Sequence, residues 1–287
     1  TRSLCDWSSD VCSSDLKFRS TSLLAFAAAG GLAFVPAATA ATGCNIADGY
    51  AATLTAYVSE VDTCLQTSTA LNVAMADDVI ERMNSDRTAQ GLAPLIRTAS
   101  LDKAASAHAL DMMSRRYADH VDKEGRDHVF RIRAFDRTML VGDTGANVLV
   151  TKVGASAADI YAAMREDKQN ARNLTRDGFT HVGMAVAVQD GQAFVVEVFA
   201  GVEGTLDRAI PLTVSDSVMV RAKLTDPKRE PVGWGLVDQA SGKLLARSKA
   251  SRMKTPFLTG TDAAVIDIVV TDQAANYVLK GPMISAQ

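Results

Sequence analysis

The side chains of this sequence best suited to chemistry at neutral pH are its four histidines, His108, His120, His128 and His181. Imidazole titrates near neutrality, so it can act as a general acid or base, and its neutral form is a common zinc ligand. Two of the four lie in one short stretch, Tyr117 to Arg131. Because His120 follows a predicted helix, we expect it at the end of that helix, facing a cleft.

The other three histidines have no evident chemical partner. His108 shares the apolar stripe of the predicted helix with Leu101 and Met112, which is typical of a hydrogen-bonded core position. His128 and His181 lack a second ligand at metal-binding spacing. The sequence also lacks a Gly-x-Ser-x-Gly elbow, a His-Glu-x-x-His motif and a phosphate-binding glycine loop. We therefore nominate no catalytic residue.

Four helical patterns surround this stretch. Apolar residues recur at helical spacing from Tyr50 to Leu65 and again around Val79 to Arg87. Ser100 is a suitable N-cap for a third helix, and Ser156 to Asp159 is a capping box that begins a fourth, which extends to near Asn170.

A hairpin follows the helices. Val182 to Val188 and Ala193 to Phe199 have strand patterns, and Asp190-Gly191 between them is a strong hairpin signal. Both faces of both strands are apolar or small, so we expect helices on both sides of the sheet. The predicted architecture is a three-layer α/β/α sandwich.

Only strand patterns follow residue 205. They are short and separated by turn residues, which predicts a small all-β sandwich domain at 205–287. Trp234 within it is interpreted as a core residue, with a stacking platform for a sugar as the alternative. The fold class is therefore α+β, in which the α/β/α sandwich is followed by this domain.

Composition excludes several classes of protein. The chain has 287 residues, of which 47% are hydrophobic and 22% charged, so it is long enough for two globular domains. Its net charge of −3 provides no basic surplus for phosphate backbones. We expect no nucleic acid partner.

The first forty residues are excluded from the fold. Residues 1–16 lack an apolar period and resemble a translated sequencing adapter, which would also account for Cys5 and Cys12. Residues 17–40 have a basic start, an apolar run and Ala38-Thr39-Ala40, as in a secretory signal peptide. The mature chain would begin near Ala41, without a transmembrane segment, in the periplasm or outside the cell.

Two cysteines then remain, Cys44 and Cys64, and an oxidising compartment favours a disulfide between them. A helix from Tyr50 to Cys64 would span about 21 Å. The extended chain from Tyr50 back to Cys44 also reaches about 21 Å. A bridge is therefore just attainable, and lipidation of Cys44 is the alternative.

A set of short motifs occurs in a familiar order: Met83-Asn84 to Arg87, His120 with Gly125 and Arg131, Gly145-Ala146-Asn147, Asn173-Leu174, and Phe179 to Gly183. In this order, the segment from about Met75 to Gly201 resembles the CAP superfamily (cysteine-rich secretory, antigen 5 and pathogenesis-related-1 proteins) in its bacterial secreted form. The resemblance implies an α/β/α sandwich with a central cleft. We place this domain at 71–204, after an N-terminal helical segment at 41–70.

Members of this family commonly hold a divalent metal in the cleft with two histidines and two acidic residues. His120 matches the first histidine, but Ala146 replaces the glutamate of Gly-Glu-Asn and Asn170 replaces the second histidine. Neither is a strong metal ligand. We therefore expect no cofactor, with a divalent metal such as zinc as the alternative. The nearby carboxylates are interpreted as solvated or paired: Glu124, Glu166, Asp167 and Glu197.

These observations favour a non-enzymatic binding module of the cell envelope. We expect a small apolar ligand or glycan at His120, Ala146, Asn147 and Asn170, and an envelope component or another protein at the β-domain. One alternative is an envelope hydrolase with His120 as general base, which requires a carboxylate such as Glu124 or Glu197 within hydrogen-bond reach of the ring. The other is a scaffold whose cleft binds nothing.

Overall fold

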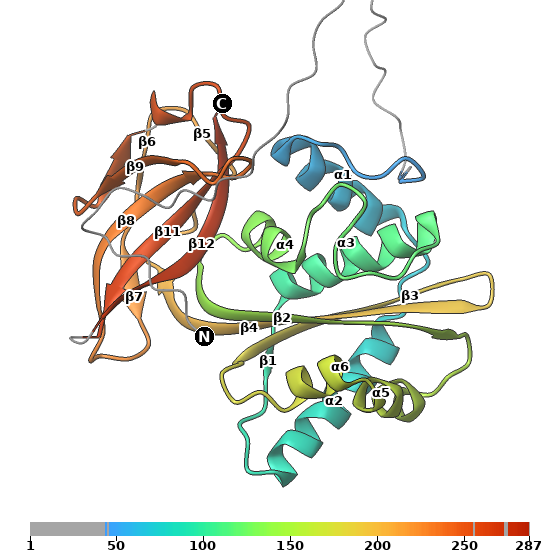
Figure 1. Ribbon diagram of the computed structural model, residues 1–287. Coiled ribbons are helices and arrows are strands. Elements are labelled where there is room, and N and C mark those ends of the chain that lie inside the picture. The colour runs from blue at the N-terminus through green and yellow to red at the C-terminus, as the bar shows by residue number, and fades with distance from the viewer. Residues whose placement is uncertain (1–43, 45, 255, 273–274, 287) are drawn as a thin grey trace, which may run out of the picture. The chain divides into compact units, whose positions relative to one another are not determined.

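The computed structural model describes residue 44 and residues 46–254, 256–272 and 275–286 (Figure 1). The predicted adapter-derived segment 1–16 and signal peptide 17–40 lie outside the described residues. The described residues belong to one compact unit. None of their helices has the length and apolar character needed to cross a membrane.

A mixed β-sheet runs through the molecule in the strand order β1-β3-β4-β2-β12-β11-β8-β9. β1 pairs with β3 in parallel, and the other neighbours in this row are antiparallel. The first four strands form the centre of the predicted sandwich: β1 (Ile96–Arg97), β2 (Met139–Lys152), β3 (His181–Gln189) and β4 (Gln192–Leu206).

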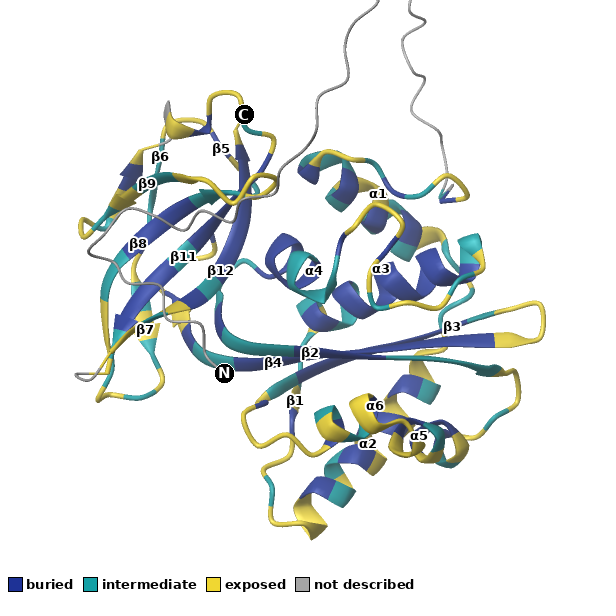
Figure 2. Cartoon of the chain, in the orientation of Figure 1, coloured by how far each residue is buried: buried dark blue, intermediate teal, exposed yellow. Residues whose placement is uncertain are grey.

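Helices cover both faces of these four strands (Figure 1). One face is covered by α1 (Leu54–Thr67), α3 (Ala99–Arg115) and α4 (His128–Phe135), and the other by α2 (Val73–Ala89), α5 (Ala157–Glu166) and α6 (Lys168–Leu174). Successive β4 residues pack into opposite cores, Val196 and Val198 with α3, and Val195 and Phe199 with α2. The three-layer α/β/α sandwich and the α+β class are confirmed. Figure 2 shows the buried sheet between helices whose outer sides are exposed.

The predicted hairpin is confirmed. β3 and β4 pair in register from His181↔Ala200 to Gln189↔Gln192. Asp190 and Gly191 connect them with φ angles of 48° and 76°. Positive φ at both central positions is the geometry of the tight turn that Asp-Gly favours.

Two central elements, β2 and α4, were not expected. β2 contains Gly142-Asp143-Thr144-Gly145, which is poor in strand-forming residues, yet it lies between β4 and β12. In α4, arginines occupy two of the buried positions, Arg131 and Arg133. The sequence of this helix therefore lacks the usual apolar periodicity. The fourth predicted helix is also two helices, because Asp167 ends α5 and its side chain caps α6.

The C-terminal residues form a third core around Trp234, Leu236 and Ile266. Trp234 is 4% exposed and its indole donates to the Ala250 carbonyl at 2.6 Å, so it is a core residue. The strands are β5 (Thr213–Val214), β6 (Ser217–Met219), β7 (Ala222–Leu224), β8 (Glu230–Asp238), β9 (Leu244–Ser248), β10 (Arg252–Lys254), β11 (Ala264–Thr271) and β12 (Asn276–Ala286).

This β region is joined to the sandwich by strand pairing. β12 meets β2 at Lys280↔Val141, and β7 pairs with the end of β4 from Gly204 to Leu206. Only β6 and β10 form a separate two-stranded sheet among the described strands. The domain boundary at 205 remains a prediction.

Cys44 and Cys64 form a disulfide, as predicted. The bridge closes because α1 begins at Leu54 rather than at Tyr50, so the preceding chain can turn back. It fixes Cys44 against the end of α1, where Ile46 and Tyr50 are buried in the core shared with α3.

Candidate functional site

The segment Tyr117 to Arg131 is a tight loop between α3 and α4. α3 ends at Arg116, which has a left-handed φ of 54° and whose backbone N–H donates to the Met112 carbonyl. The Asp127 side chain accepts from the Phe130 N–H at 2.8 Å and so caps α4. The two ends of the loop are therefore fixed by the helix caps at Arg116 and Asp127, which require no ligand.

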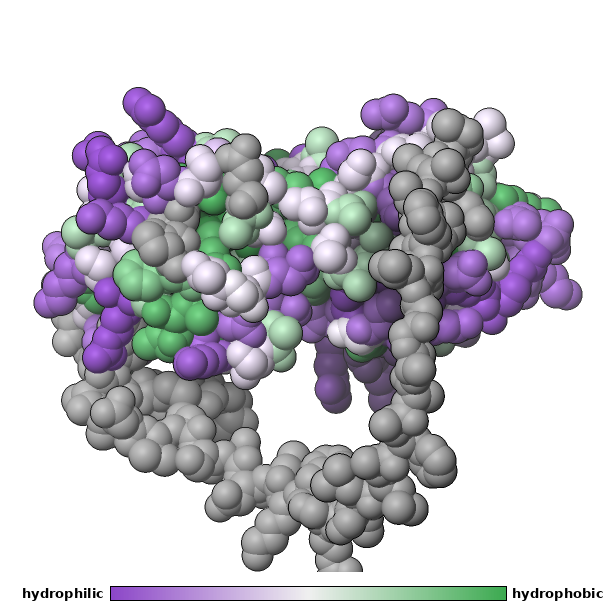
Figure 3. All heavy atoms as spheres, turned by 90° about the horizontal axis from the view of Figure 1, so that it is seen from above, coloured by the Kyte–Doolittle hydropathy of each residue, from purple (hydrophilic) through white to green (hydrophobic). Residues whose placement is uncertain are grey.

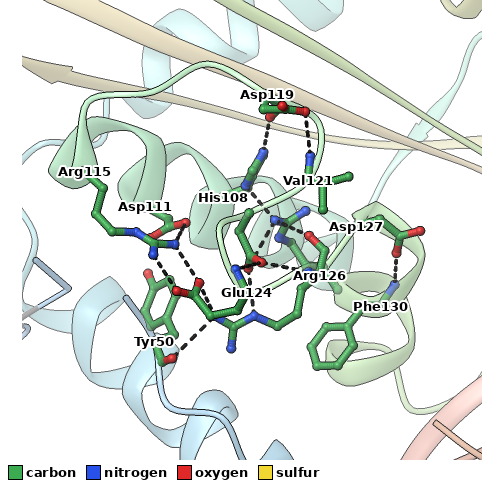
Figure 4. A network of polar contacts seen from close by, with 12 residues as sticks. Tyr50, His108, Asp111, Arg115, Asp119, Val121, Glu124, Arg126, Asp127 and Phe130 are labelled. Carbon is green, nitrogen blue, oxygen red and sulfur yellow. Dashed lines mark hydrogen bonds and ion pairs between the residues drawn. The ribbon is translucent and has the colours of Figure 1, made fainter. Parts of the chain in front are cut away.

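A network of ion pairs, buried except at Glu124, holds the loop in place (Figure 4). Arg115 binds Asp111 at 2.6 Å and Glu124 at 2.6 Å. Arg126 binds Asp122 at 2.7 Å and Glu124 at 3.0 Å. The Asp111–Arg115 and Asp122–Arg126 spacings of four residues are visible in the sequence, but the link through Glu124 requires the folded loop. Sequence reasoning therefore missed this network.

His108 is part of the same network and is a satisfied core residue, as expected. Its Nδ1 accepts from Arg131 at 2.7 Å, and its Nε2–H donates to the Asp119 carbonyl at 2.6 Å. Burial, with the charge of Arg131 second, lowers the pKa of His108 to about 2. The ring is therefore neutral at ordinary pH and fixes the position of the residue next to His120.

His120 itself is half-buried at the surface of the loop. Its hydrogen-bond contact is Gln169 of α6, with 3.4 Å between the two Nε2 atoms. Among the described residues no carboxylate makes a hydrogen bond or ion pair with this ring. The two carboxylates named as general-base partners lie elsewhere, since Glu124 is bound by Arg115 and Arg126 and Glu197 is buried in the sheet.

The other predicted ligand contacts, Ala146, Asn147 and Asn170, are brought together but are buried. Their exposed fractions are 5%, 0% and 5%. Asn147 Nδ2 donates to Glu197 Oε2 at 2.8 Å and to the Asn170 carbonyl at 3.3 Å. Asn170 Nδ2 donates to the Val148 carbonyl at 3.3 Å. These side chains therefore join α6 to β2, and their contact with a ligand remains a prediction.

Glu197 is the most unusual group of this buried cluster. It is fully buried, and its Oε1 has no hydrogen-bond partner. Burial raises the pKa of Glu197 to about 7, and the hydrogen bond from Asn147 lowers it only in part. The sequence placed Glu197 on a strand face but could not show that its partner is Asn147, fifty residues earlier on β2.

The remaining polar candidates are held by local contacts. His128 Nε2 lies 3.3 Å from Thr144 Oγ1, while its Nδ1 is buried without a partner. His181 Nδ1 lies 2.8 Å from Thr180 Oγ1. Glu166 is exposed, and Asp167 caps α6. None of these four residues joins His120 in a shared site within the described structure.

The residues at the family's metal positions do not fit a divalent ion. Of the three positions matched in this sequence, one imidazole remains. Ala146 and Asn170 replace the other two ligands and are buried, and the Asn170 amide is bonded internally. One other group of carboxylates, Asp111, Asp122 and Glu124, has oxygen atoms within 4.8 Å of one another. Arg115, Arg126 and Arg131 already neutralise these three charges, so this geometry serves ion pairs.

A groove of about 620 Å³ lies between the end of α1, α3 and the β3–β4 hairpin. Its apolar floor includes Ile46, Ala70, Leu110 and Met113, all of the core shared with α1 and α3. None of the described residues that line it is charged. Its rim carries hydroxyl and amide groups, from Thr67, Ser68, Thr69, Ser114 and Gln189. A second groove of about 480 Å³ between α2 and α5 is instead lined by Asp78, Glu81 and Arg82.

The uncharged groove was not predicted from sequence. Its lining comes from four segments, beginning at Cys44 and ending at Gln189, and the disulfide and the Val188 N–H to Ala70 carbonyl bond bring them together. Exposed apolar residues elsewhere are scattered: Val73, Ile96, Val121, Val153, Leu244, Phe257 and Val278. Figure 3 accordingly shows hydrophobic patches interrupted by hydrophilic ones on the face seen from above.

Comparison with known proteins gives one family. Residues 80–199 match the family described as CAP, the cysteine-rich secretory protein family. A search of curated proteins gives no match. The matched segment contains α3, the loop with His120, and the buried Asn147–Glu197 pair.

Solved structures similar to this chain include three bacterial proteins. An outer surface protein from Borrelia burgdorferi is 16% identical, with a TM-score of 0.41, over 45% of this chain and 93% of that chain. An extracellular SCP-domain protein from Bacillus anthracis is 17% identical, with a TM-score of 0.37, over 50% of this chain and 43% of its own. A cysteine-rich secretory protein from Staphylococcus aureus is 15% identical, with a TM-score of 0.36, over 47% of this chain and 40% of that chain.

Proposed function

Because residues 80–199 match the CAP family, we propose that this chain is a non-enzymatic binding module of the bacterial cell envelope whose ligand is uncharged. The observation that carries the proposal is the groove of about 620 Å³ beside α1, whose lining, as far as the structure describes it, contains no charged residue. Ligand sites of small molecules commonly have about 300 to 1,000 Å³, an apolar lining and a few polar groups. The groove has a volume in this range, and its lining combines apolar side chains with hydroxyl and amide groups.

The lining defines the class of ligand. The floor, with Leu110 and Met113, can cover an apolar face, and the rim, with Thr69 and Gln189, can hydrogen-bond hydroxyl or amide groups. A charged ligand would lose hydration without gaining an ion pair. A small apolar molecule or a neutral glycan therefore suits this groove.

The geometry at His120 supports binding over hydrolysis. A general base needs an oriented imidazole and a site for the substrate. Here the ring contacts Gln169, and both Glu124 and Glu197 are engaged by other side chains. The envelope-hydrolase alternative therefore has no supporting contact among the described residues.

The disulfide supports a location outside the cytoplasm. Cys44–Cys64 holds the wall of the groove, and such bonds persist in oxidising compartments. We propose a periplasmic or secreted protein, and we assign contact with an envelope component or another protein to the C-terminal β region.

The groove can be tested with two neutral probes. We expect Nile red to gain fluorescence with wild-type protein, or an N-acetylglucosamine trimer to shift the amide resonances of Ser68 to Ala70. Ala70→Glu places a charge in the groove and should weaken either interaction at least about tenfold, since burying an unpaired charge costs more than about 1.4 kcal/mol. Val153→Glu is the matched control, because Val153 is 50% exposed and lies outside the groove.

Two results would count against this assignment. One is no binding of either probe by protein that melts cooperatively. The other is equal loss of binding in Ala70→Glu and Val153→Glu. Calorimetric titration of Zn²⁺ addresses the metal alternative, where sub-micromolar stoichiometric binding that disappears in His120→Ala would restore a metal site.

A further inference from the structure

The buried pair Glu197 and Asn147 joins three elements of the sandwich. Asn147 of β2 and Met184 of β3 are the cross-strand neighbours of Glu197 on β4. The Asn147 amide donates to Glu197 Oε2 at 2.8 Å. The second oxygen, Oε1, is buried and has no partner.

Asn147 passes this contact on to α6. Its Oδ1 accepts from Asn173 Nδ2 at 2.9 Å, and Asn173 Nδ2 also reaches the Ala146 carbonyl at 3.0 Å. The Asn170 side chain adds a bond to the Val148 carbonyl. α6 is thus fastened to β2 by amide side chains. The Asn147 amide is oriented by donating to Glu197 Oε2 and accepting from Asn173.

We propose that protonated Glu197 is a positioning residue that fixes α6 on the sheet, and that its ionisation loosens α6 and the Gln169–His120 contact. A neutral carboxylic acid is less costly to bury in this position, because it carries no charge and its Oε2 accepts from Asn147. A carboxylate would leave a buried charge with one donor and no counter-ion. The inference concerns the edge of the domain at His120 and does not depend on ligand binding in the uncharged groove.

The groups around Glu197 offer no compensating charge. On β2 and α6 its surroundings are the amides of Asn147, Asn170 and Asn173, and on β3 the apolar Met184. The titratable group of α5 that senses its charge is Tyr161, whose pKa is raised first by burial.

Charged groups on the neighbouring helices are engaged elsewhere or exposed. The Tyr161 hydroxyl donates to Asp86 of α2 at 2.7 Å, and Asp86 also lies 3.6 Å from Arg165 of α5. Arg87 of α2 donates to the Leu174 carbonyl at the end of α6. Lys168 and Arg172 of α6 itself are exposed. The burial that raises the pKa of Glu197 is therefore not offset by an ion pair.

Hydrogen exchange of the mature protein measures the expected loosening. Between pH 6 and pH 9, after correction for intrinsic exchange, protection of the α6 amides should fall at least about tenfold in wild type. Glu197→Gln keeps the shape and the acceptor oxygen but cannot ionise, so its α6 protection should not change with pH. Glu166→Gln makes the same substitution at an exposed position and should behave as wild type.

Infrared spectroscopy measures the protonation of Glu197 independently. If Glu197 only filled space, its acid carbonyl band would not change with pH. At pH 6 the wild-type spectrum should contain the carbonyl band of a buried protonated acid, which is absent in Glu197→Gln and disappears from wild type at pH 9. The inference is overturned if α6 protection is independent of pH in wild type, or if Glu197→Gln shows the same loss. Absence of the acid band at pH 6 would also overturn it.

Discussion

His108 shows how one buried side chain sets the acid stability of this protein. Its pKa is lowered in the folded state by burial and by Arg131, so protonation favours the unfolded chain. The stability it contributes is complete above its unfolded pKa of about 6.5 and is lost as pH falls below that value. Since the folded pKa is about 2, the loss should continue over the whole acid range, at about 1.4 kcal/mol per pH unit.

Urea unfolding at a series of pH values measures this loss. His108→Gln can accept from Arg131 and donate to the Asp119 carbonyl, but it cannot gain a proton. The free energy of unfolding of wild type relative to His108→Gln should therefore decrease between pH 6.5 and pH 4.5. A difference that stays constant over this range would show that His108 is not held neutral.

The candidate residues were only partly predictable from sequence. The prediction of His108 as a core residue is confirmed, because it depends on local pattern. His120 was expected at the end of a helix facing a cleft, but it lies in the loop that follows the α3 cap at Arg116. The sequence could not show that Asn147 and Glu197 form a pair, because their contact depends on the register of β2 against β4. The acidic partners of the arginines were missed for the same reason, since Glu124 reaches Arg115 only when the loop is closed.

At the scale of elements, predictability followed local periodicity. The β3–β4 hairpin has alternating or continuous apolar residues and an Asp-Gly turn, and its turn and pairing were found from sequence. β2 was missed because its polar residues are satisfied by partners on β4 and α6, which no local window contains. α4 was missed because Arg133 is buried against carbonyls of β11 and β12.

The disulfide acts on α1, which lies before the matched CAP segment. Cys44 and Cys64 are separated by twenty positions. Closing a loop of this length lowers the conformational entropy of the unfolded chain and so stabilises the folded state by about 3 kcal/mol. We expect the double variant Cys44→Ser, Cys64→Ser to lose about this much free energy of unfolding, with the largest increase in hydrogen exchange in α1.

Dithiothreitol provides the control for this change. Reduced wild type should have the same urea midpoint as the double variant, and the double variant should not respond to the reductant. An unchanged midpoint in both cases would show that packing of Tyr57 and Val61 holds α1 without the bridge.

For the whole molecule, the central question is whether the C-terminal β region unfolds with the sandwich. Among the described residues, β12 meets β2 only at Lys280↔Val141 and β7 pairs with β4 only from Gly204 to Leu206, so strand pairing alone is a narrow connection. Two arginines at the end of α4 strengthen it. Arg133 donates to the Gly281 and Ile266 carbonyls and to Asp267 at 2.7 Å, and Arg137 reaches the Ile210 and Met283 carbonyls.

We expect these arginines to make unfolding cooperative. In protein beginning at Ala41, Trp234 is the sole tryptophan, and its fluorescence reports the β region while far-ultraviolet circular dichroism reports the helices. The two urea transitions should coincide in wild type. Arg133→Met leaves Asp267 and two carbonyls without their donor, which should cost about 3 kcal/mol and let the Trp234 transition precede the helical one.

Arg165→Met is the control. It removes an exposed arginine 3.6 Å from Asp86 and should change the free energy of neither transition by more than about 0.5 kcal/mol. Separate transitions already in wild type would instead establish an independent domain boundary near residue 205, and coincident ones in Arg133→Met would assign the coupling to the strand pairs.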